Sequence, residues 1–115
     1  MTALRLISLP THAALELAAG LGLMVAPFAL GFSTAGIVAA VAIGALVAGL
    51  AAATPEGNTI PISAHWTFDQ ALALGLLGSA AVIGLAGDHV AAVTFAIAAL
   101  IQVALNLTTR YSARS

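Results

Sequence analysis

The chain has 115 residues, of which 62% are hydrophobic and 6% are charged. Soluble domains carry about 25% charged residues, so this composition cannot supply a water-facing surface. A net charge of −1 leaves no basic surface for nucleic-acid phosphates. The lack of cysteine excludes disulfides, thiolate metal sites and cysteine nucleophiles. We therefore expect one membrane domain over residues 1–115, with the lipid bilayer as its surroundings and no nucleic-acid partner.

Four apolar stretches are long enough for membrane-spanning helices, which need about 20 residues each. Turn-forming residues separate them, and the longest connection, 54–61, contains two prolines and the main polar cluster. The expected fold class is an all-α polytopic membrane protein. Its helices are predicted at 11–32, from the turn at 31–36 to about 53, at 66–85 and at 90–109.

Two helix starts carry capping signals. Thr67 and Gln70 have the spacing of a capping box at the start of the third helix. Asp88 is placed to accept hydrogen bonds from the first N–H groups of the fourth helix.

The orientation follows from the positive charges, which concentrate on the cytoplasmic side of membrane proteins. Arg5 precedes the first helix, and Arg110 and Arg114 follow the last one. Both termini are therefore predicted to be cytoplasmic, in the cell membrane. Trp66 and Tyr111 are predicted to lie at the membrane interface, which amphipathic rings favour.

The chain repeats itself at an offset of 53 residues. His12 and Glu16 correspond to His65 and Asp69 at that offset. The segments 21–23 and 74–76 both have the sequence Leu-Gly-Leu, and Gly31 matches Gly84. Shortening the second turn by one residue also aligns 38–41 with 90–93.

Each repeat is thus a two-helix hairpin, the first at about 11–53 and the second at about 65–109. Because each unit crosses the membrane twice, both hairpins point the same way. This predicts a parallel repeat about an axis along the membrane normal.

Two segments carry a family resemblance. The segment His65–Asp69 combines aromatic and acidic residues near the start of a predicted helix. The segment Ala26–Phe32 follows a Gly-Leu segment and contains a proline. Together they resemble the SPW-repeat membrane proteins, although Ala26 and Phe28 stand in place of Ser and Trp. The resemblance implies an integral membrane fold and supplies no reaction or ligand.

The repeated His-x-x-x-acid pattern is the main candidate site. A spacing of four puts His12 and Glu16 on one helix face, and likewise His65 and Asp69. If the two helices adjoin, the four side chains suit a Zn²⁺ or Mn²⁺ ion or a proton relay. The favoured interpretation is simpler, with the acids stabilising the positive end of each helix dipole from its first turn. The metal, if any, is left undetermined.

A stripe of small residues follows one face of the second helix and allows close backbone approach to a partner inside the chain or in another subunit. Its members are Gly36, Ala40, Gly44, Ala48 and Ala52. The fourth helix carries a polar stripe, expected to make interhelical hydrogen bonds or, alternatively, a translocation path. This stripe consists of Thr94, Gln102 and Asn106.

These features favour a non-enzymatic membrane scaffold or accessory subunit that acts through helix packing, as a homo-oligomer or within a larger complex. No cofactor is expected. The alternative is a minimal transporter or channel for protons, metal ions or small solutes that uses the His–carboxylate pairs. An enzyme is not expected, because no nucleophile, base and orienting group can be placed together.

Overall fold

The fold is a bundle of four α-helices in a computed structural model that describes residues 6–53 and 61–111. All four helices are long and apolar enough to cross a membrane, which confirms the predicted all-α class and makes the chain a multi-pass membrane protein. Residues 54–60 of the predicted loop at 54–61, together with Arg5 and Arg114, lie outside the described residues. The helices are α1 (Leu9–Leu30), α2 (Thr34–Ala53), α3 (Ile62–Leu85) and α4 (His89–Thr108).

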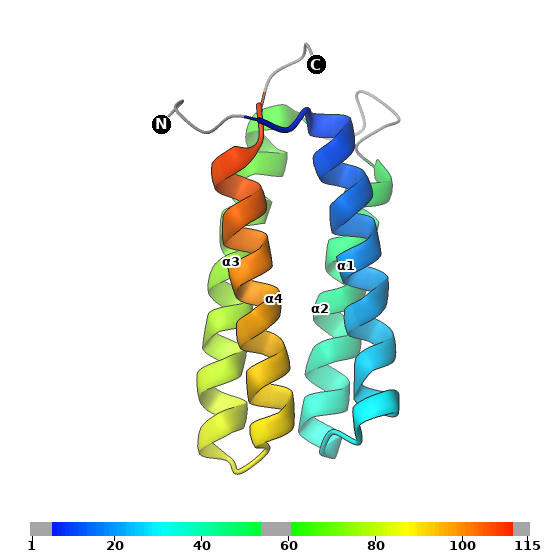
Figure 1. The fold of residues 1–115 in the computed structure, drawn as a ribbon, viewed down its shortest axis with the longest axis vertical. Helices are drawn as coiled ribbons and strands as arrows, with labels where there is room; N and C mark the ends of the chain where they lie inside the picture. The colour runs from blue at the N-terminus through cyan, green and yellow to red at the C-terminus, as the bar shows by residue number, and fades with distance from the viewer. Residues whose placement is uncertain (1–5, 54–60, 112–115) are drawn as a thin grey trace.

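The helices form two hairpins that lie side by side, α1 with α2 and α3 with α4 (Figure 1). The first and last described segments meet at one end of the bundle. There the Ile7 amide donates to the carbonyl of Thr108 at 2.9 Å, and the Arg110 amide donates to the carbonyl of Ile7 at 2.8 Å. We call this the closed end, and the end with the turns 31–33 and 86–88 the turn end.

The starts of α1 and α3 lie earlier than predicted. Ser8 caps α1 by accepting a hydrogen bond from the Thr11 amide. Helix α3 begins directly after Pro61, whose missing N–H removes no hydrogen bond of the helix. The predicted capping box at Thr67 is therefore wrong. Its hydroxyl donates instead to the carbonyl of Ser63, within the same helix, at 3.0 Å.

Asp88 caps α4 as predicted and also ties the hairpins together at the turn end. Its Oδ1 accepts from the Ala91 amide at 3.1 Å, and its Oδ2 accepts from the Ser33 amide at 2.7 Å. The hydrogen bonds from Ser33, and then that from Ala91, lower the pKa of the Asp88 carboxyl below its ordinary value.

Glycine permits a very close approach within the first hairpin. A Cβ added at Gly44 would lie 2.7 Å from the carbonyl oxygen of Gly20, and one added at Gly20 would lie 2.8 Å from the Ala48 nitrogen. Of the predicted small-residue stripe, Gly36, Ala40 and Gly44 are buried, whereas Ala48 is half-buried and Ala52 is exposed. The close partner of Gly44 is thus α1 of the same chain, and Gly36 lies against Asp88 and Ala91 of the second hairpin.

The buried faces reveal the register of the repeat. In α1 and α3 they match at the predicted offset of 53, with Gly20 equivalent to Ala73. In α2 and α4 the offset is 55, so that Gly44 is equivalent to Ala99. The predicted alignment of 38–41 with 90–93 is therefore wrong, because α3 is 24 residues long and α1 is 22. Gly87 is the turn glycine of the second hairpin, with φ of 102°, and Gly84 is helical.

An apolar core joins the hairpins between the closed end and the turn end. It is built from small and large side chains that interlock: Leu23, Phe32, Ala40, Leu76, Ile83, Ala91, Phe95 and Ala99. Phe32 of the first turn and Phe95 of α4 meet with ring centroids 6.3 Å apart. The buried polar side chains of the described residues lie between this core and the closed end.

Candidate metal centre

The two His–acid pairs lie inside the bundle, near its closed end. Glu16 is the eighth residue of α1, and Asp69 is the eighth of α3. At 1.5 Å per residue, both acids lie about 10 Å along the helix from its start. Neither helix has an acid in its first turn, so the interpretation of these acids as dipole partners is wrong. The side chains of both pairs are at most 2% exposed.

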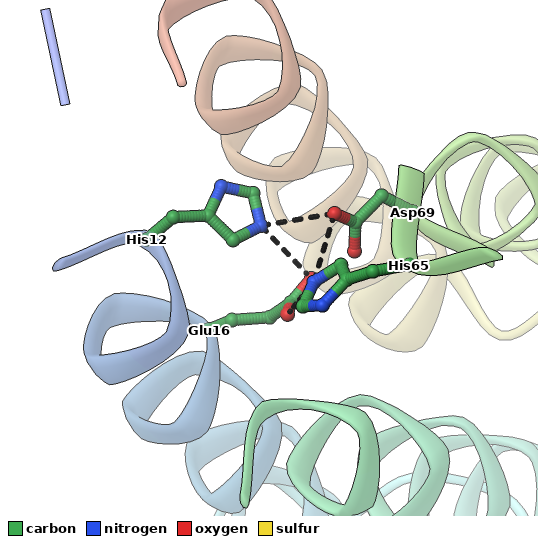
Figure 2. Close-up of side chains that lie close together, drawn as sticks. All are labelled: His12, Glu16, His65 and Asp69. Atoms are coloured by element: carbon green, nitrogen blue, oxygen red, sulfur yellow. Dashed lines mark ion pairs between the residues drawn. The ribbon is translucent and has the colours of Figure 1, made fainter. Parts of the chain in front are cut away.

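The four side chains converge on one point between the hairpins. Figure 2 shows them directed toward one another, two from α1 and two from α3. The His12 Nε2 atom lies 3.4 Å from Glu16 Oε2 and 3.1 Å from Asp69 Oδ2. The His65 Nε2 atom lies 3.4 Å from Glu16 Oε1 and 3.1 Å from Asp69 Oδ2. Both imidazoles thus lie closer to the Asp69 carboxylate than to the Glu16 carboxylate.

These distances have the size of the edges of a metal coordination tetrahedron. One ligating atom from each side chain can be chosen so that all four lie within 4.8 Å of one another. Zn²⁺ binds imidazole and carboxylate at about 2.1 Å, which places the ligands of a regular tetrahedron about 3.4 Å apart. Two imidazoles and two carboxylates are a donor set that suits Zn²⁺, Mn²⁺ or Fe²⁺.

Thr109 fixes which nitrogen of His12 faces the centre. The Thr109 hydroxyl donates its one proton to the carbonyl of Leu105, at 2.5 Å. Its oxygen therefore accepts from His12 Nδ1, 2.6 Å away, so that Nδ1 carries the hydrogen. In the neutral ring this leaves a lone pair on Nε2. Within the described chain that atom is buried without a hydrogen-bond partner, and the hydrogen bond at Nδ1 orients the ring as such bonds orient metal-binding imidazoles.

Two amides of α4 bind the acidic residues of the centre, one at a carboxylate and the other at a backbone carbonyl. Gln102 Nε2 donates to Glu16 Oε2 at 3.0 Å and to Asn106 Oδ1 at 2.8 Å. Asn106 Nδ2 donates to the backbone carbonyl of Asp69 at 3.1 Å. Two members of the predicted polar stripe are thus part of the centre, as outer-shell partners of its ligands.

Tyr111 covers the centre from the closed end. Its hydroxyl donates to Asp69 Oδ2 at 2.6 Å, and its ring meets those of His12 and His65 at centroid distances of 5.6 and 6.2 Å. Tyr111 was expected at the membrane interface, and no role was predicted for Thr109. The signal for both is weak, because neither belongs to the repeat and both follow the last helix. Trp66, in contrast, is 48% exposed, as expected at an interface.

The polar stripe of α4 does not continue through the bundle. The Thr94 hydroxyl donates to the carbonyl of Val90, in its own helix, at 2.9 Å. Between Thr94 and Gln102 the buried positions of α4 are Phe95 and Ala99, which belong to the apolar core. The described residues therefore form no continuous polar path across the membrane.

Two carboxylate oxygens of the centre lack hydrogen bonds. Glu16 Oε1, which lies 3.4 Å from His65 Nε2, and Asp69 Oδ1 accept no hydrogen bond from the described residues, although both atoms are buried. Buried polar atoms in proteins are nearly always paired with a protein group, water or an ion. The free oxygens therefore point to a cation or to ordered water between the helices.

Comparison of the chain with models of known protein families, with curated proteins and with solved structures finds no match.

Proposed function

We propose that this protein binds one divalent transition-metal ion inside its membrane-spanning bundle, through His12, Glu16, His65 and Asp69. The observation that carries the proposal is the convergence of four buried donor atoms at the spacing of a coordination tetrahedron. Zn²⁺ and Mn²⁺ are the ions that best suit this donor set.

Charge balance supports the same assignment. Two carboxylates from α1 and α3 meet in the interior of the bundle, where an uncompensated charge is expensive. One divalent cation bound by two neutral imidazoles and two carboxylates gives a net charge of zero, the same net charge as two protonated imidazoles paired with the carboxylates in the metal-free protein. An ion also occupies the space that Glu16 Oε1 and Asp69 Oδ1 face without a hydrogen bond.

The four protein ligands and the apolar core beyond them favour retention of the ion over its passage. Structural zinc sites have four protein ligands, whereas catalytic ones keep a position open. We therefore rank a metal-holding or metal-sensing membrane protein above a transporter and above an enzyme. By the positive-inside rule, the closed end of the bundle lies on the cytoplasmic side of the cell membrane. The ion therefore enters from the cytoplasm.

The accessory-subunit function remains a second proposal. The small-residue stripe that suggested it is already packed inside the chain, Gly44 against α1 and Gly36 against Asp88 and Ala91 of the second hairpin, which weakens its role in binding partners. The exposed Ala52 and the lipid-facing side of the bundle are the surfaces left for an oligomer or a larger complex. Membership of the SPW-repeat family also remains a prediction.

The test is metal binding by the purified protein in detergent. We expect one ion per chain after dialysis against Zn²⁺ or Mn²⁺, measured by elemental analysis. Co²⁺ is expected to give the absorption bands of a tetrahedral site in competition with Zn²⁺. His65→Gln should lose the ion, and His89→Gln is the matched control, because His89 is exposed at the turn end. A wild-type protein that binds no stoichiometric metal would refute the proposal.

A further inference from the structure

The contacts within a hairpin differ from those between the hairpins. Within the first hairpin, α1 and α2 touch backbone to backbone at Gly20 and Gly44. Between the hairpins, α2 and α3 are separated by a groove of about 470 Å³. Apolar residues of both helices line it, among them Leu46, Leu50 and Phe68.

The polar links between the hairpins lie at the two ends of the bundle. At the turn end, the Ser33 amide is bound by Asp88. At the closed end, Ile7 pairs with the 108–110 segment, and the His–acid pairs of α1 and α3 face each other. The side chains between these ends interlock through the apolar core, which has no directional bonds.

The ligands of the metal centre are divided equally between the hairpins. The first hairpin supplies His12 and Glu16, and the second supplies His65 and Asp69. An ion at the centre is therefore bonded twice to each hairpin. Without it, each hairpin keeps one buried carboxylate oxygen that accepts no hydrogen bond, Glu16 Oε1 and Asp69 Oδ1, and such oxygens favour the entry of water.

From this arrangement we infer that the ion clamps the two hairpins together, so that metal occupancy sets how tightly α2 and α3 close at the closed end of the bundle. The inference rests on the proposed metal binding and extends it to regulation. The turn end, held by Asp88 and Ser33, is the hinge of this movement. The groove between α2 and α3 is the space that changes its width. Such a device converts metal concentration into a change of shape on the lipid-facing surface.

The experiment measures distances between spin labels on the two hairpins. The chain has no cysteine, so that introduced cysteines are labelled specifically. Ala52→Cys and Thr67→Cys place labels on exposed positions of α2 and α3 near the closed end. Leu15→Cys with Ala52→Cys is the matched control, since both exposed positions belong to the first hairpin. All four metal ligands stay intact in both pairs.

Each labelled sample is measured after treatment with a chelator and again with Zn²⁺, and elemental analysis follows the bound metal. We expect Zn²⁺ to narrow the distance distribution between hairpins and to shorten its mean by about 2 Å or more, the scale of hinge movements. The pair within the first hairpin should not respond. Stoichiometric Zn²⁺ with unchanged distances between hairpins would overturn the clamp and leave metal binding intact. Absence of bound Zn²⁺ would overturn both.

Discussion

Helices α2 and α4 hold equivalent places in the two hairpins, but they present different chemistry to the metal centre. At the offset of 55 residues, α4 has Gln102 where α2 has Val47, and Asn106 where α2 has Ala51. The amides of α4 bind the two carboxylates or their backbone, and the apolar residues of α2 have no such group to offer. The repeat thus supplies two equivalent pairs of candidate ligands. Because α2 and α4 have diverged, only α4 supplies amides that hydrogen-bond to the acidic ligand residues.

The hairpins also differ in how closely their helices approach. The first hairpin crosses at Gly20 and Gly44, and the equivalent residues of the second are Ala73 and Ala99. A Cβ at Gly44 would lie 2.6 Å from the Met24 Cγ atom and 2.7 Å from the Gly20 oxygen. Substitutions at matched positions of the two hairpins therefore distinguish features common to both hairpins from features found in only one of them.

The largest effect is expected where the repeat is symmetric. Glu16→Gln and Asp69→Asn preserve shape but remove the charge of one ligand each, so each should weaken Zn²⁺ binding at least about 100-fold, or about 2.7 kcal/mol. The measurement is competition of Zn²⁺ with a chelating dye. Because both residues belong to one site, the double variant should lose much less than the sum of the single losses. Additive losses at the two positions would indicate two separate sites.

Overpacking of the glycine crossing should give the next largest effect. Gly44→Leu places a large side chain against the backbone of α1 and should destabilise the fold by about 1–3 kcal/mol. Thermal unfolding in detergent, followed by circular dichroism, measures the loss. Gly22→Leu is the matched control in the same hairpin, because a Cβ at Gly22 meets nothing within 4 Å. Equal melting temperatures for the two variants would contradict the crossing.

A third substitution makes α4 resemble α2 at one position. Gln102→Val removes the donor to Glu16 Oε2, and loss of such an outer-shell partner typically weakens metal binding about 10–100-fold. The apolar side chain should keep the helices packed, but the lost hydrogen bonds to buried Glu16 and Asn106 should cost the metal-free protein about 1–3 kcal/mol. A variant with the metal affinity of the wild type would show that Gln102 has no part in the centre. Isothermal titration with Zn²⁺ distinguishes these outcomes.

The smallest effect is expected at the turn end, where Asp88 joins the hairpins. Its pKa is lowered in the folded protein, so its stabilising contribution is present above the ordinary pKa of 3.8 and is lost as the pH falls further. Asp88→Asn should slightly lower the melting temperature at pH 7, and the difference from the wild type should shrink below about pH 4. A difference that stays constant from pH 7 to pH 3 would exclude the charge of Asp88 as its cause.

Composition and periodicity were enough to predict the four helices and the equivalence of the two His–acid pairs. Apolar length determines a membrane span locally, because every backbone group of a span must be bonded within its own helix. The repeat at offset 53 was visible because His12 and His65 are rare polar residues in an apolar sequence. The helix starts were placed too late, because the residues at 9–10 and 62–65 carry no strong local signal against the apolar background.

The convergence of the two pairs could not be predicted, because it depends on how α1 and α3 are rotated about their axes and which faces they turn inward. The second offset, 55, was hidden by the abundance of alanine and valine, which align by chance at several registers. The contributions of Thr109 and Tyr111 arise where the chain after α4 folds back across the closed end and pairs with Ile7. Local sequence thus determined the spans and their pairing, whereas helix rotation and chain closure, which act over long sequence distances, decided that four ligands share one site.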